Sequence, residues 1–244
     1  MRFNSDQIQK IGKEISSKVD GKTLFDEFSR GRYSTDASVY QIKPLGVVLP
    51  KDTNDVLSLM EYSQKNSVPL LARGGGSSQC GQTVGESVVL DYSKHQNKIL
   101  ELNVEEKYVW VQPGVVLDHL NDYLKPHGLW FPVDVSTSSR ATIGGMSANN
   151  SCGSRSLYYG NMVHNVLAIE AILDDGSIFQ FDQINKNYLA TKNNQDRLYK
   201  IIDKFIDVRQ KVGSEIDANW PTTQRRVGGY NIDLIDPEGF NSSN

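Results

Sequence analysis

The 244 residues predict an α+β fold, and three patterns lead to that class. Residues 38–72 have the pattern of a strand, an amphipathic helix and a second strand. Residues 166–181 have the pattern of a β-hairpin, and residues 196–213 that of a long amphipathic helix. The chain shows no internal repeat, so we expect a mixed architecture rather than a repeat protein.

The first expected element is a helix over residues 5–19, with Ser5 as its N-cap. Its apolar residues recur at helical spacing: Ile8, Ile11, Ile15 and Val19. Residues 38–50 alternate in polarity and are rich in β-branched side chains, which predicts a strand that ends at Pro50.

Residues 52–66 predict an amphipathic helix and residues 68–72 the strand after it, so a β-α-β unit leads into the glycines that follow. Three further strands are expected over residues 87–91, 98–103 and 107–112. Residues 115–128 predict a helix that is stopped by Pro126 and Gly128.

The expected hairpin has its turn at residues 174–176, and the helix over residues 196–213 ends at a glycine. Beyond it, apolar residues continue with no further predicted element to bury them: Trp220, Tyr230, Ile232, Leu234, Ile235 and Phe240. They are either a tail packed on the domain surface or the beginning of a second domain.

The composition is that of an ordinary globular protein, with 38% hydrophobic and 23% charged residues. A formal net charge of −3 gives no electrostatic reason to expect nucleic acid or an anionic membrane as a partner. The two cysteines, Cys80 and Cys152, form no disulfide framework, so we expect a reducing, cytoplasmic setting. The sequence also indicates neither a signal peptide nor a membrane span.

The stretch LLARGGGSSQCGQTVG, residues 70–85, places three glycines after a short apolar run. Glycine allows a ligand to approach closely, and successive backbone N–H groups can form a nest for an anion such as phosphate. The spacing excludes a dinucleotide fingerprint, because Gln79 stands where the third glycine would be. No GxxxxGK[ST] loop occurs, and a flexible surface loop is the alternative reading.

A second polar segment, residues 132–165, shows little periodicity and carries another glycine pair at Gly144 and Gly145. A loop of this length is uncommon inside a compact domain unless it is functional. Two segments rich in glycine and hydroxyl groups indicate one elongated ligand held at two places. A dinucleotide has that shape, and neutral donors suit a chain of this net charge.

Six motifs occur in an order that carries a family resemblance: PKDTNDV at residue 50, RGGGSS at 73, VQPG at 111, GLWFP at 128, ATIGG at 141 and YG at 159. Together they resemble the FAD-linked oxidases of the vanillyl-alcohol-oxidase type. Within that group, the chain is similar to the branch of D-lactate, glycolate and D-2-hydroxyglutarate dehydrogenases. The resemblance covers residues 35–182.

The resemblance implies a PCMH-type FAD-binding domain, in which two α/β subdomains clasp FAD, without the C-terminal cap domain of longer relatives. The expected boundaries are an N-terminal helical extension (1–34), the FAD-binding domain (35–213, divided into 35–112 and 113–213) and a tail leading towards the absent cap (214–244).

The resemblance also implies the cofactor-binding residues. Backbone N–H and hydroxyl groups of the first loop would hold the pyrophosphate, through Gly74, Gly75, Gly76, Ser77 and Ser78, continued by Gly81 and Gln82. The opposite side of FAD would be lined by Pro132, Asp134, Ser136, Thr142, Gly144, Gly145, Ala148, Asn150, Gly153 and Gly160, with Ile169 on a central strand. Arg73 would add a charge-assisted contact, or a structural salt bridge at the loop base. For Asp134, capping a turn in FPVDVS is the preferred reading.

Ser77 stands where relatives with covalently bound flavin carry a histidine, so the resemblance implies non-covalent FAD. None of the four histidines has metal-ligand spacing, and no metal is expected. RRVGGYN resembles the stretch that leads into the cap, which makes Arg226 and Tyr230 the candidates for reaching the substrate. The resemblance identifies no catalytic base in this chain.

We therefore expect the FAD-binding domain of a dehydrogenase or oxidase that acts on a small D-2-hydroxy acid, with a cap domain or partner subunit completing it. The inner face of a membrane would be a peripheral location for a longer protein of this kind. One alternative is a stand-alone FAD-binding electron-transfer subunit without its own substrate site. The other is a nucleotide-binding module without a redox role.

Overall fold

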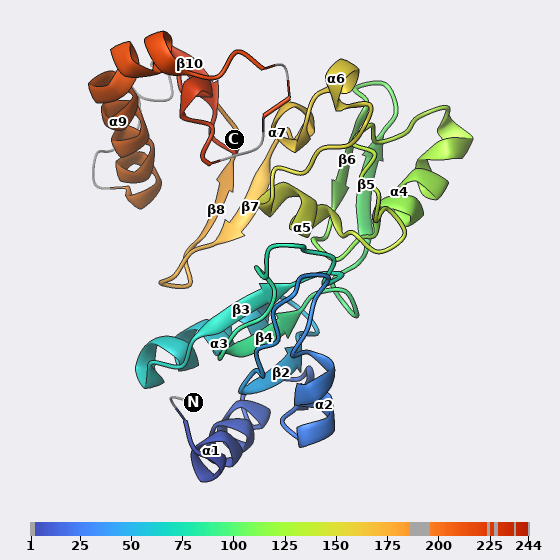
Figure 1. Ribbon diagram of the computed structural model, residues 1–244, viewed down its shortest axis with the longest axis vertical. Coiled ribbons are helices and arrows are strands. Elements are labelled where there is room, and N and C mark those ends of the chain that lie inside the picture. Colours follow the sequence, from blue (N-terminus) through green and yellow to red (C-terminus); the bar gives the residue numbers. More distant parts are fainter. Residues whose placement is uncertain (1–2, 186–195, 224, 227–228, 237, 244) are drawn as a thin grey trace.

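The computed structural model describes residues 3–185, 196–223, 225–226, 229–236 and 238–243. Figure 1 shows two halves: one holds the N-terminal helices and a four-stranded sheet, and the other holds the elements after residue 98. Helices and strands are mixed in both halves, which confirms the α+β class expected from the sequence.

The sheet of the first half contains β1 (Lys22–Leu24), β2 (Gly46–Leu49), β4 (Val88–Asp91) and β3 (Leu70–Arg73), in that spatial order. β4 pairs in parallel with both β2 and β3, and β1 is antiparallel to β2. Helix α3 (Thr53–Asn66) connects β2 to β3, which confirms the predicted β-α-β unit. In the pairing of β3 with β4, Arg73 lies opposite Asp91, so the last residues of these two strands are side by side.

Both central strands, β2 and β4, are buried along their whole length because each face of the sheet is covered. One face packs Val48 and Val88 against α3 and α1 (Ser5–Ser16), and the other packs Val47 and Val89 against Leu24 and neighbouring residues. Helix α1 is capped by Asn4, not by Ser5 as the sequence suggested, since the Asn4 side chain accepts from the N–H of Gln7.

The chain between α2 (Glu27–Arg32) and β2 differs from the sequence prediction. The strand expected over residues 38–50 is confined to residues 46–49, and α2 was not expected at all. Residues 33–42 instead form a loop outside the sheet, in which Thr35 and Gln41 form an isolated antiparallel bridge.

The second half begins with the antiparallel pair β5 (Ile99–Asn103) and β6 (Tyr108–Val111). Helix α4 (Leu117–Leu124) and the 3₁₀ turn η1 (Lys125–His127) follow, and the turn ends at Gly128 with φ of 70°. Leu120 and Leu124 of α4 are buried against the apolar face of β5 and β6.

The second polar segment, residues 132–165, contains three short helices that the sequence did not reveal: α5 (Ile143–Ala148), α6 (Ser156–Tyr159) and α7 (Met162–Asn165). Helices of four to six residues have too few turns to show an amphipathic period. Met146 and Met162 anchor them in a core cluster with Val133, which is fully buried.

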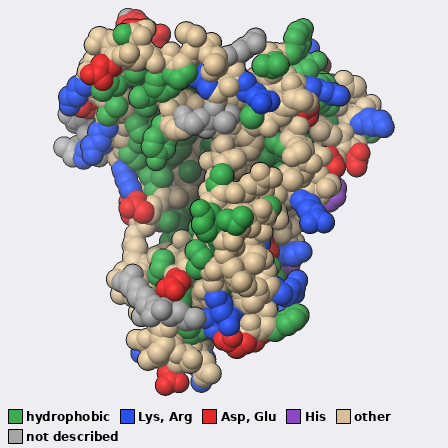
Figure 2. Space-filling model, viewed as in Figure 1, with side chains coloured by type: hydrophobic (Ala, Val, Ile, Leu, Met, Phe, Trp, Pro, Cys, Tyr) green, Lys and Arg blue, Asp and Glu red, His purple; other side chains and the backbone are tan. Residues whose placement is uncertain are grey.

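The predicted hairpin is confirmed as β7 (Ile169–Ile172) and β8 (Ile178–Phe181). Strand β9 (Gln183–Asn185) follows it, and helix α9 (Arg197–Asn219) runs past Gly213, where the sequence predicted its end. Figure 2 shows apolar side chains gathered over the region of α9 and β8, and Phe205 and Val208 of α9 are 40% and 45% exposed.

The C-terminal tail is packed against the second half. A 3₁₀ turn, η2 (Ile232–Leu234), precedes β10 (Gly239–Asn241), which pairs with β9. Phe240 is 5% exposed and shares a core cluster with Ile184 and Ile202. Phe240 of this tail is thus packed on the domain surface, whereas Tyr230 is 91% exposed.

Candidate functional site

The glycine loop, residues 74–85, begins where β3 ends. The backbone N–H groups of residues 74–78 donate no hydrogen bond to any described part of the chain. The Cys80 N–H has a partner, the hydroxyl of Ser78 at 3.2 Å. These five successive N–H groups follow the carboxyl end of a strand and belong to residues that are all at least partly exposed, so they form a row of donors suited to an anion.

The glycine loop packs against residues 140–142 of the second polar segment. A Cβ on Gly75 would collide with the carbonyl oxygen of Arg140, and one on Gly74 would collide with the hydroxyl of Thr142. The left-handed residues of the loop are Gly76, with φ of 65°, and Gly81, with φ of 79°. The structure thus brings together the two polar segments that the sequence analysis paired.

A hydrogen bond also links these segments. The side-chain amide of Gln82 donates to Asn149 Oδ1 at 2.9 Å. The oxygen of the same Gln82 side chain, Oε1, is contacted by the Ser78 hydroxyl. Ser77 makes no side-chain hydrogen bond within the described chain, so its hydroxyl is available to a ligand.

Arg73, directly before the glycines, is bound to carbonyl oxygens. Its guanidinium donates to Thr35 O at 2.8 Å, Thr83 O at 3.1 Å and Tyr33 O at 3.4 Å. Burial lowers the pKa of this guanidinium, although the nearby Asp91 carboxylate opposes the shift. Of the two roles expected for Arg73, structural bonding at the loop base is present, but its partners are carbonyl groups rather than a carboxylate.

The predicted glycines of the second polar segment have N–H groups that are already bonded. Gly144 donates to Pro113 O at 2.9 Å, Gly153 to the Ser156 hydroxyl at 2.9 Å, and Gly160 to Ser156 O at 3.0 Å. These glycines therefore serve close packing rather than donation. Thr142, only 2% exposed, caps α5 and accepts from Gly145 N–H at 3.4 Å.

Asp134 caps a turn, but not the turn in FPVDVS that the sequence suggested. Its carboxylate accepts from the Ser154 hydroxyl at 2.7 Å and from the Arg155 N–H at 3.0 Å, so it holds the start of α6. Burial raises the pKa of Asp134, but these hydrogen bonds outweigh burial and the pKa lies below its ordinary value. The carboxylate is thus a structural acceptor.

Asn150 and Ile169 both line a small cavity of about 40 Å³, which is also lined by Met162 and Asn231. Asn150 has φ of 43°, and its side chain accepts from Val163 N–H at 3.0 Å. The other predicted lining residues lie at the surface or partly buried: Pro132 is half-buried, whereas Ser136 and Ala148 are exposed.

The C-terminal tail contacts the second polar segment directly, which the sequence did not predict. Arg225 donates to Gly153 O at 3.0 Å, and the side-chain amide of Asn161 donates to Arg226 O at 2.9 Å. Asn150 also donates to Asn231 Oδ1 at 3.2 Å. No sequence signal marks these pairs, because two of the three contacts use backbone carbonyl groups.

The two substrate candidates differ in their surroundings. The Arg226 guanidinium is paired with the Asp233 carboxylate and lies 6.0 Å from the centre of the Trp220 ring. Tyr230 is 91% exposed. In the described ranges, no group of His, Cys, Asp and Glu side chains could hold a metal ion, and no helix is long and apolar enough to cross a membrane.

The fold is similar to that of solved enzyme structures. The structure of alkyldihydroxyacetonephosphate synthase aligns with a TM-score of 0.63 at 20% identity, covering 71% of this chain and 34% of that one. The structure of p-cresol methylhydroxylase aligns with a TM-score of 0.58 at 18% identity, covering 78% and 38% respectively. These likenesses confirm the PCMH-type fold expected from the motifs.

The chain belongs to the FAD binding domain family, whose sequence model matches residues 44–182. It is 42% identical over 209 residues to D-2-hydroxyglutarate dehydrogenase of Haemophilus influenzae, covering 82% of this chain and 20% of that protein. It is 35% identical over 177 residues to glycolate oxidase subunit GlcD of Bacillus subtilis, covering 71% and 38%. The chain thus spans about a fifth of the length of the first relative.

Proposed function

We propose that this chain is the FAD-binding part of a flavin-dependent dehydrogenase that oxidises a small D-2-hydroxy acid. The free N–H groups of residues 74–78 are the observation that carries the proposal, since a pyrophosphate would satisfy them. The hydroxy-acid substrate class rests on the relatives, which are named for D-2-hydroxyglutarate and glycolate.

The residues of the glycine loop suit a pyrophosphate. Ser77 adds a hydroxyl donor beside the free N–H groups, and none of these donors is charged. Ser78, whose hydroxyl contacts Gln82 Oε1, would contribute its N–H group. Neutral donors bind an anion without a basic patch, which agrees with the net charge of −3. Gly81 and Gln82 would keep the far end of the loop in place, through the bond from Gln82 to Asn149.

The second polar segment would form the opposite wall of the cofactor site. We assign this wall the residues already named from the family resemblance: Pro132, Asp134, Ser136, Thr142, Gly144, Gly145, Ala148, Asn150, Gly153, Gly160 and Ile169. The bonded N–H groups of its glycines favour a wall that supports the cofactor by shape. We further propose that the cofactor is not covalently bound, because Ser77 cannot form the bond that a histidine would supply.

When bound, FAD would supply the hydride acceptor for oxidation of the hydroxyl carbon. This chain's residues would bind and orient it. A base for the substrate hydroxyl and cations for its carboxylate are also needed. We propose that the part of the longer relatives beyond this match corresponds to the region that supplies them, and that Arg226 and Tyr230 are the substrate candidates within this chain.

A binding experiment tests the cofactor proposal. The purified chain, freed of flavin, is titrated with FAD, FMN and riboflavin while flavin fluorescence is followed. A pyrophosphate site predicts that FAD binds more tightly than FMN, and FMN more tightly than riboflavin. Equal binding of FAD and riboflavin would contradict the pyrophosphate assignment, and no binding of any flavin would favour a nucleotide-binding module instead.

A further inference from the structure

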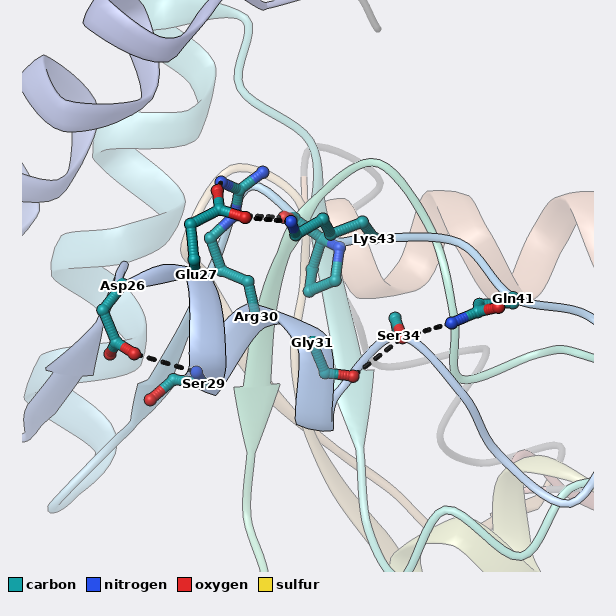
Figure 3. A network of polar contacts seen from close by, with 9 residues as sticks. Asp26, Glu27, Ser29, Arg30, Gly31, Ser34, Gln41 and Lys43 are labelled. Atoms are coloured by element: carbon teal, nitrogen blue, oxygen red, sulfur yellow. Dashed lines mark hydrogen bonds and ion pairs between the residues drawn. The ribbon is translucent and has the colours of Figure 1, made fainter.

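The loop of residues 33–42, which we call the brace, is closed at its base. The backbone N–H of Ile42 donates to Ser34 O at 2.9 Å, and the Ser34 hydroxyl donates to Gly31 O at 2.7 Å. The side-chain amide of Gln41 donates to the same hydroxyl at 3.5 Å (Figure 3). The two ends of the brace are therefore bonded to each other.

Charged residues hold the brace to α2 from outside. Figure 3 shows the Glu27 carboxylate between the cationic groups of Arg30 and Lys43, and it is paired with both. Arg30 is 5% exposed, and its Nε donates to Pro44 O at 2.8 Å. The chain on both sides of the brace is thus fixed to one short helix.

The first residues of the brace contact the glycine loop through the guanidinium of Arg73. Its guanidinium donates to two brace carbonyls, those of Tyr33 and Thr35, and to one glycine-loop carbonyl, that of Thr83. A planar guanidinium with five fixed donors can bridge three carbonyls in this way, whereas an ammonium group lacks that geometry.

Two more contacts join the same segments. The Thr83 hydroxyl donates to Asp36 Oδ2 at 3.0 Å. The Tyr40 ring covers Gly81, since a Cβ on that glycine would lie 2.6 Å from Tyr40 Cδ2. The brace thus contacts the glycine loop at positions 81 and 83, near its far end.

The sheet anchors the brace. The Tyr33 hydroxyl donates to Asp91 Oδ2 at 2.6 Å, and the Arg73 guanidinium carbon lies 5.2 Å from the centre of the Tyr33 ring. Asp91 ends β4 and is 4% exposed. Burial, together with the Asp91 carboxylate, raises the pKa of Tyr33, so its hydroxyl remains protonated and continues to donate.

We propose that the brace presets the shape of the glycine loop, and that Arg73 is a positioning residue rather than a phosphate-binding cation. Residues 74–78 donate no backbone hydrogen bond to the described chain, and the Arg73 guanidinium packs against them at Gly76, where an added Cβ would collide with Arg73 Nη2. Arg73, held by the brace carbonyls, is therefore the contact through which the brace reaches these residues. A loop ordered before binding loses less conformational freedom when an anion binds, which raises affinity. The effect on FAD rests on the proposed function, whereas the effect on the loop does not.

The test compares Arg73→Gln and Arg73→Lys with Arg32→Gln, a matched variant of an exposed arginine on α2. In flavin-free protein, backbone ¹⁵N relaxation reports the order of residues 74–78. We expect order parameters near the rigid value of about 0.85 in the parent, and below about 0.6 in both Arg73 variants. FAD affinity should fall about tenfold in both, since Lys keeps the charge but loses the fork.

The outcomes separate the two proposals. Full FAD affinity in Arg73→Lys would show that a point charge suffices, and unchanged loop order in both variants would show that the brace is not needed; either result overturns the inference. If no flavin binds to the parent, the order parameters still decide the role of the brace. Thr83→Val, which removes only the bond to Asp36, should loosen the loop in the same direction, and it replaces the Arg73 variants if these fail to fold.

Discussion

The carbonyl oxygen of Arg140 occupies the place where a side chain on Gly75 would begin. These two residues belong to the two polar segments, which contact each other near the candidate cofactor site. Gly76, with φ of 65°, is the left-handed residue of the glycine triplet, whereas Gly75 has no positive φ. A glycine is required at position 75 because Arg140 leaves no room for a Cβ.

Gly75→Val should abolish FAD binding, because the added side chain would push residues 140–142 away from the glycine loop. The matched control is Gly85→Ala, where a Cβ would make only ordinary contacts at 3.5 Å or more. Flavin content of the purified proteins is the measurement. A Gly75→Val protein that stays as yellow as the parent would show that the contact between the two segments is not needed.

Gly76→Ala and Gly128→Ala separate backbone strain from loop function. Both glycines have positive φ, 65° and 70°, so alanine should cost about 1 kcal/mol of unfolding free energy at either position. A Cβ on Gly76 would also collide with the Arg73 guanidinium, whereas one on Gly128 would meet open space. We expect weaker FAD binding only in Gly76→Ala, measured by titration beside chemical unfolding. Equal FAD affinity in both variants would argue against a role for the loop geometry.

The cofactor should be released by acid. The proposed non-covalent binding predicts that precipitation of the purified protein with acid leaves FAD in the supernatant. Absorbance of the two fractions measures this. Flavin that remains with the washed pellet would mean that another side chain forms a covalent bond.

Asp134 should contribute stability that is lost in acid. Its native pKa lies below the ordinary value of 3.8, so the native state binds a proton less readily than the unfolded chain. The contribution is therefore complete above the ordinary pKa and is lost as the pH falls through the native pKa. Asp134→Asn should unfold more easily than the parent at about pH 7, with the difference shrinking towards about pH 3.

Chemical unfolding at both pH values measures this effect, and Asp203→Asn on the exposed surface of α9 is the control. A constant difference between parent and Asp134→Asn across the range would show that the carboxylate charge does not contribute.

The 244 residues alone should bind FAD but reduce it negligibly with D-lactate, glycolate or D-2-hydroxyglutarate. Oxidation of the substrate also needs a proton acceptor and cations, and Arg226 and Tyr230 are the substrate candidates that we name within this chain. Anaerobic mixing with each acid, followed by flavin absorbance, is the test. Rapid bleaching would show that this chain's own side chains complete the site.

Sequence patterns located the elements that carry their own boundary signals. Helix α3 begins after Asp52, whose side chain caps it, and the β7–β8 turn contains Gly176 with φ of 81°. The predicted end of α9 was wrong because burial of Ile216 favours continuing the helix past Gly213. A glycine costs only about 1 kcal/mol inside a helix, so tertiary packing can outweigh it.

The glycine loop was recognisable because glycines and hydroxyl side chains are visible in the sequence. The brace was not, because Arg73 is bound by the carbonyl groups of Tyr33 and Thr35, and any residue type supplies a carbonyl. The β-branched character of residues 38–50 also predicted a longer strand than pairing with β1 and β4 allows.

The position of Phe240 has a consequence for the synthesis of the protein. The buried members of the first-half core all precede residue 92, so its sheet can form while the rest of the chain is still being translated, with Ile172 packing against it later. The cluster around Ile184 and Ile202 lacks a member until residue 240 emerges. The edge of β9 that pairs with β10 therefore stays open from the time residue 185 emerges until residue 240 does, and during that interval it can pair with another chain.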